Sequence, residues 1–100
     1  MFLVKDRLII DNMAHIIKVD GTIVPMETQG VVPLEALQKA VGGLIQIIPI
    51  KDEYMIIDEE GKFKNGGIEN IEATKLAQGY IFDEDYIAGD VVICSSNEIE

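Results

Sequence analysis

The stretch LQKAVGGLIQIIPI, residues 37–50, decides the fold because a helical pattern runs through it directly into an apolar strand. Apolar side chains spaced by three and four residues predict the buried face of a short amphipathic helix. These side chains are Leu34, Leu37, Ala40 and Val41. Gly42 suits the left-handed conformation that ends many helices. The segment LIQII that follows is apolar on both faces, which predicts a central or covered strand closed by Pro49.

Strand patterns lie on both sides of this stretch. Upstream, HIIKV and TIVPM predict strands at about 14–19 and 22–27, and Asp20-Gly21 between them is typical of a hairpin turn. Pro25 has no amide donor, so we expect it on an edge strand or at a bulge. Downstream, YMIID and KFK predict a second hairpin with Gly61 in its turn.

A second helix and a last strand follow. Asn70 is a favoured N-cap residue for IEATKLAQ, in which Ile71, Leu76 and the stem of Lys75 are expected to face inward. The apolar run from Val91 to Cys94 predicts a buried last strand. The order β-β-α-β-β-β-α-β predicts an α+β fold, in which two short helices pack on one face or at one end of a curved, mainly antiparallel sheet.

A chain of 100 residues, 48% of them hydrophobic, supports one hydrophobic core. We therefore expect a small single α+β domain at 13–100, preceded by an N-terminal extension or edge strand at 1–12. The charges of Lys5, Asp6 and Arg7 interrupt any secretory signal, and no apolar run approaches the roughly 20 residues that span a bilayer. The expected location is the cytoplasm, without membrane insertion.

The charge distribution favours some partners over others. The formal net charge is −10, and residues 51–100 carry thirteen acids against four bases. Such a chain is repelled by phosphate backbones, so direct nucleic-acid binding is disfavoured. The acidic half either keeps the protein dispersed or meets a host protein with a basic surface. In the second case, we expect the contacts from two acidic clusters, which are Asp58, Glu59, Glu60 and Asp83, Glu84, Asp85.

A small anionic ligand has few candidate contacts. The segment GKFKNGG does not fit the phosphate-binding pattern GxxxxGK[ST], and a hairpin followed by a turn explains it better. For a small nucleotide, the plausible contacts are Gly42, Gly43, Lys62 and Lys64, provided that the glycine turn opens at the surface near the two lysines. Otherwise the two glycines only end the helix and reverse the chain.

Metal and catalytic signatures are weak. His15 is the only histidine and Cys94 the only cysteine, so a structural zinc site cannot form within one chain, and the single thiol fits a reducing compartment. The segment DEDYIAGD has Ala88 where a calcium loop has glycine. We expect no metal and no cofactor. A small enzyme would have to use Cys94, beside His15, or carboxylates of the second half.

The succession LQKAVGG, DEEGKFKNG, IENIEATKLA and IAGDVVIC resembles the family catalogued as domain of unknown function 3846, over about residues 14–95. The resemblance implies an origin in phages, prophages or other mobile elements. It implies no catalytic residues. The positions that carry it are Leu37, Gly42, Gly43, Glu60, Gly61, Asn70, Ala73, Gly89 and Val92.

These observations lead to three hypotheses for the function. The favoured one is a non-catalytic binding protein of a mobile element, a host-takeover or counter-defence factor that binds a bacterial protein or sequesters a small nucleotide. The second is a small enzyme that uses Cys94 or second-half carboxylates. The third is a structural component, which differs from the first in forming a persistent homo-oligomer.

Overall fold

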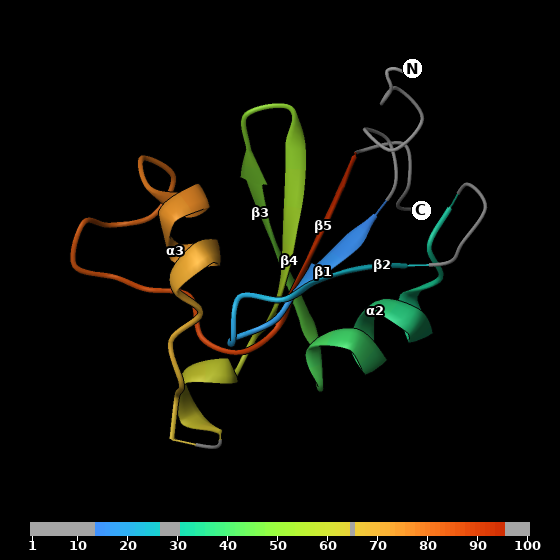
Figure 1. Ribbon diagram of the computed structural model, residues 1–100, viewed down its shortest axis with the longest axis horizontal. Coiled ribbons are helices and arrows are strands. Elements are labelled where there is room, and N and C mark those ends of the chain that lie inside the picture. Colours follow the sequence, from blue (N-terminus) through green and yellow to red (C-terminus); the bar gives the residue numbers. More distant parts are fainter. Residues whose placement is uncertain (1–13, 27–30, 65, 96–100) are drawn as a thin grey trace.

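A computed structural model describes residues 14–26, 31–64 and 66–95, and the expected extension at 1–12 lies outside these residues. The fold is α+β, as predicted: within the described residues, five strands form an open antiparallel sheet with two helices (Figure 1). The elements are β1 (His15–Ile17), β2 (Ile23–Pro25), α2 (Leu34–Val41), β3 (Ile45–Ile50), β4 (Glu53–Asp58), the 3-10 turn η2 (Gly61–Phe63), α3 (Ile71–Ala77) and β5 (Val91–Ser95).

The last strand is the centre of the sheet, whose strand order is β2-β1-β5-β4-β3. β5 pairs antiparallel with β1 on one side and with β4 on the other, and Val92 is opposite both Ile16 and Ile56. All residues from Val91 to Cys94 are buried, which confirms the predicted last strand. The β1–β2 hairpin and the β3–β4 hairpin form the two halves of the sheet. The sheet is therefore complete only when β5 pairs with both of them.

β3 is an edge strand of the described sheet, so of the two predicted alternatives, a central or a covered strand, the central one is wrong. The amide of Glu59 donates to the carbonyl of Leu44 at 2.8 Å. Because hydrogen-bonded pairs alternate in an antiparallel ladder, the odd residues of β3 then direct their backbone groups away from β4. Pro49 lies inside β3 rather than closing it, and its missing donor therefore falls on the open edge, where no ladder bond is lost.

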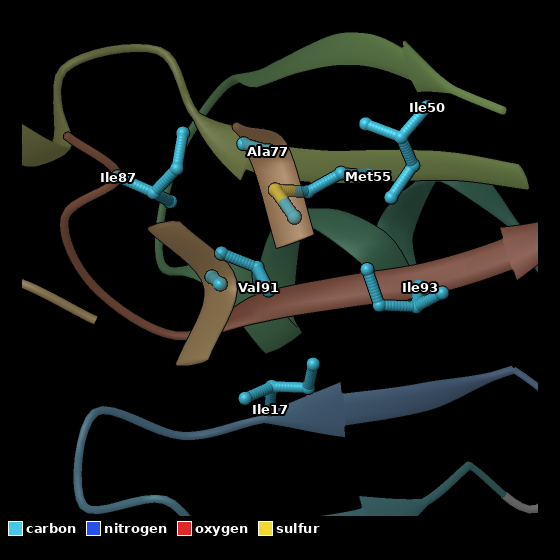
Figure 2. Packing of buried hydrophobic residues seen from close by; sticks show 8 residues of the cluster. Ile17, Ile50, Met55, Ala77, Ile87, Val91 and Ile93 are labelled. Atoms are coloured by element: carbon cyan, nitrogen blue, oxygen red, sulfur yellow. The ribbon is translucent and has the colours of Figure 1, made fainter. Parts of the chain in front are cut away.

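The two helices cover opposite faces of the sheet, so the expectation that both pack on one face is wrong. One buried cluster joins α3 to the sheet through Ala73 and Ala77, with Met55 at its centre (Figure 2). The other joins α2 to the sheet through Leu37 and Val41. Neighbouring residues of a strand point to opposite faces, so the apolar β5 is covered on both sides.

α3 presents a different face to the sheet than its sequence predicts. Ala73 and Ala77 are fully buried, whereas Ile71 is 57% exposed and Leu76 is 48% exposed. The cap at Asn70 fixes this rotation: its Oδ1 accepts from Ala73 N at 3.1 Å and its Nδ2 donates to the Ile17 carbonyl at 2.8 Å. The residues that α3 turns toward the sheet are therefore the small side chains of Ala73 and Ala77.

The segment KFK is not a strand, so the predicted hairpin at Gly61 is wrong. Residues Gly61–Phe63 form a 3-10 turn, and β4 pairs instead with the preceding strand β3. The β3–β4 turn lies at Lys51 and Asp52, where Lys51 has φ +49°. The hairpin between β1 and β2 and the edge position of Pro25 agree with the prediction.

Candidate functional site

A cleft of about 540 Å³ opens on the α3 side of the sheet. Its floor comes from β3 and β4, through Gln46, Ile48 and Ile57. One wall is the turn η2, and the other is the loop of residues 79–88, which connects α3 to β5. The volume falls within the range of roughly 300–1,000 Å³ that is usual for small-ligand pockets.

Four of the six aromatic residues in the sequence line this cleft. They are Phe63, Tyr80, Phe82 and Tyr86. Phe63 is 88% exposed and Phe82 is 85% exposed, so both rings keep most of their surface in water. Exposed aromatic side chains that gather around a hollow make it a candidate binding surface, because a ligand that covers them removes apolar area from contact with water. No motif in the sequence pointed to these residues, although YIFDEDY holds three of them within residues 80–86.

The polar part of the cleft is built around Lys62. Its ammonium pairs with the carboxylate of Asp85 and lies 4.8 Å from the centroid of the Tyr86 ring. The hydrogen bond from Lys62, together with one from the backbone amide of Tyr86, lowers the pKa of Asp85 below its ordinary value. Gly67 makes room for this arrangement, since a Cβ there would lie 2.5 Å from the Lys62 carbonyl oxygen.

Hydrogen bonds to the second helix hold the loop wall in place. The backbone amide of Ile87 donates to Thr74 Oγ1 at 2.9 Å, and the Ile87 carbonyl accepts from the backbone amide of Asn70 at 2.8 Å. Gly61 completes the contact between the two walls, because a Cβ there would lie 2.8 Å from the carbonyl oxygen of Ala88. The end of the loop wall nearest β5 is therefore fixed to α3 and to the Gly61 turn.

The four residues predicted to contact a nucleotide do not all line the same hollow. Lys64 lies beside Gly42 and Gly43, but its ammonium pairs with Asp58 at 3.0 Å and donates to the Gly42 carbonyl at 3.2 Å. A Cβ at Gly43 would lie 2.5 Å from that ammonium, so the glycine makes room for the ion pair. A separate hollow of about 280 Å³ borders Gly42 and Lys64, whereas Lys62 lines the aromatic cleft.

The predicted acidic contacts divide into three groups. Asp58 is buried and structural, since it accepts from both Lys64 and the amide of Glu60. Glu59 and Asp85 line the aromatic cleft, which Asp58 also borders. Glu60, Asp83 and Glu84 are exposed, the last two at a turn in which the Asp85 amide donates to the carbonyl of Phe82.

Of the residues considered for catalysis, Cys94 and His15 are not in the cleft lining, whereas the second-half carboxylates Asp58, Glu59 and Asp85 are. Cys94 is buried, and the His15 side chain points to the opposite face of the sheet because His15 pairs in register with Ile93. Among the described residues, no three His, Cys, Asp or Glu side chains gather in a way that could hold a metal ion. Within the same residues, no helix is long and apolar enough to cross a membrane.

Comparison with known families assigns the chain. The sequence profile described as a domain of unknown function (DUF3846) matches residues 8–100, so the chain belongs to this family. The match starts earlier and ends later than the 14–95 expected from sequence motifs. No curated protein and no solved structure matches the chain significantly. The assignment therefore fixes the family without supplying an activity.

Proposed function

We propose that this protein is a non-catalytic binding protein whose aromatic cleft receives a basic, partly apolar segment of a partner protein. The observation that carries the proposal is the cleft itself, in which Phe63 and Phe82 stay exposed beside carboxylates. Aromatic side chains dominate the energetic centres of protein interfaces, where they bury large rigid surfaces. The same residues cost solubility in an isolated chain, which supports a binding role for them.

Charge favours a basic partner. Asp58, Glu59 and Asp85 line the cleft together with Lys62, and the ion pairs Lys62–Asp85 and Lys64–Asp58 leave Glu59 unbalanced. The turn with Asp83 and Glu84 adds two exposed charges beside this cleft. A partner segment with arginine or lysine next to apolar side chains matches both properties, and the acidic surface would speed its approach.

The biological setting is part of the same proposal. A host-takeover or counter-defence factor of a phage or another mobile element would act in the bacterial cytoplasm by occupying a host protein. The resemblance noted above suggests this origin, and the net charge of −10 fits a target with a basic surface. Such a factor would need affinity and specificity but no chemical step.

One observation favours a second candidate, a protein that sequesters a small nucleotide. Bases stack on exposed aromatic rings, and each such contact contributes about 1–3 kcal/mol to binding. Phe63 and Phe82 offer such rings. Against this candidate, the ammonium groups of Lys62 and Lys64 are neutralised by carboxylates, so phosphate groups find no unpaired lysine among the residues that line the two hollows.

Fluorine NMR can separate the two candidates. The chain has three phenylalanines, so protein labelled with 4-fluorophenylalanine gives three signals, and Phe63→Leu and Phe82→Leu assign two of them. We expect a tetrapeptide of alternating arginine and leucine to shift both signals in a saturable way. A tetrapeptide of alternating glutamate and leucine is the matched control and should leave them in place.

Two outcomes would contradict the proposal. If neither peptide shifts the Phe63 and Phe82 signals, the cleft is not a site for basic segments. If adenosine monophosphate shifts them at micromolar concentrations and the arginine peptide does not, the nucleotide candidate replaces the protein partner. The double variant Phe63→Ser/Phe82→Ser, examined by calorimetry with the same peptide, should lose binding while its thermal unfolding stays cooperative.

A further inference from the structure

We propose that Asp85 and Tyr86 form a cation subsite within the cleft, which Lys62 fills in the isolated chain and an arginine side chain of the partner takes over on binding. This inference rests on the proposed function and names the chemistry of its key contact. In this arrangement, Lys62 competes with the arginine of the partner for Asp85 and the Tyr86 ring.

The resident lysine shows what the subsite accepts. The ammonium of Lys62 contacts the carboxylate of Asp85 and, at the same time, lies 4.8 Å from the Tyr86 ring centroid. A carboxylate next to an aromatic face is a combination that binds organic cations, because charge and ring quadrupole act together. The backbone amide of Tyr86 donates to Asp85 at 2.8 Å, so the carboxylate is oriented before any ligand arrives.

The resident cation can be displaced. The side chain of Lys62 is 40% exposed, and η2, which carries it, is a turn of three residues. An exposed ion pair contributes little net stability, since water screens it and two side chains must be held in place. Lys62 can therefore swing into solvent without unfolding the loop wall of residues 79–88, which the hydrogen bonds of Ile87 hold independently.

A guanidinium is the better occupant. It presents a planar fork of donors to a carboxylate and stacks on an aromatic ring. An ammonium is a compact point charge that can do neither. The rings of Phe63, Tyr80 and Phe82 line the same cleft and can cover the apolar stem of an arginine. Glu59 is a second carboxylate in the lining that can accept from the fork.

Titration with a minimal probe tests the exchange. The probe is N-acetyl-arginine amide, its neutral isostere N-acetyl-citrulline amide is the ligand control, and the readout is the set of assigned fluorine signals. We expect Lys62→Met to bind the arginine probe about tenfold more tightly than the unaltered chain, because removal of the internal cation frees both the ion pair and the ring. Asp85→Asn should weaken the same binding about tenfold.

Matched variants control for net charge and for the acidic surroundings. Lys75→Met removes one positive charge from α3, where Lys75 pairs with Glu72 at 3.6 Å outside the cleft lining. Asp83→Asn removes one exposed carboxylate near Asp85. We expect both to change the affinity for the arginine probe less than about twofold, as screened surface charges do. A tenfold effect in either control would show that net charge, not the subsite, governs binding.

The result that overturns the inference differs from the one that overturns the proposed function. If Lys62→Met binds the arginine probe no more tightly than the unaltered chain, Lys62 is not a competitor and the subsite is refuted. The arginine–leucine peptide is measured on the same sample, and saturable shifts of the Phe63 and Phe82 signals would keep the cleft as a binding site. Equal binding of the citrulline and arginine probes would also refute a cation subsite.

Discussion

Replacement of Asn70 should lower the free energy of unfolding more than the small size of its side chain suggests. Its side chain is fully buried and makes three hydrogen bonds that link three segments. Nδ2 donates to the carbonyls of Ile17 in β1, at 2.8 Å, and of Gly89 before β5, at 2.9 Å. Oδ1 accepts from Ala73 N at 3.1 Å and caps α3. One amide therefore fixes the helix, the central strand and its neighbour relative to one another.

The expected cost follows from these contacts. Asn70→Ala removes an N-cap, which costs about 1 kcal/mol, and leaves two carbonyls without their donor, each at about 1 kcal/mol or more. The sum is about 3 kcal/mol, a large part of the roughly 5–15 kcal/mol by which a typical domain is stable. For a chain of this size, such a loss lowers Tm by roughly 10–25 °C.

Two variants of the same residue separate the cap from the donors. Asn70→Ser keeps an acceptor for the helix amide and should recover about 1 kcal/mol relative to Asn70→Ala. Asn70→Asp keeps the cap but places a carboxylate oxygen opposite the carbonyl oxygens of Ile17 and Gly89. Repulsion between these oxygens raises the pKa of the introduced carboxyl group in the folded state. Stability from a group with a raised pKa is present at low pH and lost as pH rises. The deficit of Asn70→Asp relative to the unaltered chain should therefore grow between about pH 4 and pH 7.

Urea denaturation followed by circular dichroism measures these differences. Gln78→Ala, an exposed amide at the other end of α3, is the control and should cost less than about 0.5 kcal/mol. If Asn70→Ala costs no more than this control, the three bonds do not hold the fold together. If the deficit of Asn70→Asp is independent of pH, the carboxylate does not face the two carbonyls in the folded state.

Gly43→Ala should cost no more than about 1 kcal/mol in urea denaturation, because its Cβ would only push the flexible end of Lys64 away from Asp58; an equal cost in a Lys64→Ala background would contradict this reason. Ala77→Leu should cost about 1–3 kcal/mol by overfilling the buried α3 contact, and an unchanged Tm would show that α3 does not pack tightly. Because Lys62 lowers the pKa of Asp85, the stabilisation from this carboxylate is present above its unfolded pKa and lost as pH falls through its folded pKa. Asp85→Asn should accordingly lower Tm at pH 7 but not near pH 2, and an equal effect at both would refute the ion pair.

Features that depend on neighbouring residues could be predicted from the sequence. Gly42 ends α2 with φ +93° and donates its amide to the carbonyl of Gln38 at 2.8 Å, as a left-handed cap should. Asn70 caps α3 for an equally local reason. The edge position of β3 could not be predicted in this way, because β5 decides it by pairing with β4. A strand at an edge can be apolar on both faces when helices cover the two sides of the sheet.

The candidate site was predicted less well for a similar reason. Lys62 and Lys64 are two residues apart, and at a 3-10 turn, with three residues per turn, such side chains point in different directions. They consequently border different hollows. The aromatic cleft joins Phe63 to residues 80–86. No periodic pattern in the sequence indicates that segments so far apart come into contact. Only the return of the loop across the sheet brings the rings together.

The ion pairs change how the acidity of this chain should be interpreted. Residues 51–100 contain four lysines, and three of them pair with acids of the same half: Lys62 with Asp85, Lys64 with Asp58, and Lys75 with Glu72. These three lysines are thus paired within the fold. Under the proposed function, a partner that approaches the cleft would meet the exposed rings of Phe63 and Phe82 and the carboxylate of Glu59, and its arginine would replace Lys62. If the acidic residues only kept the chain dispersed, the exposed aromatic rings in the cleft would have no explanation. If these rings stacked on a nucleotide base, we would expect an unpaired lysine nearby for the phosphate group.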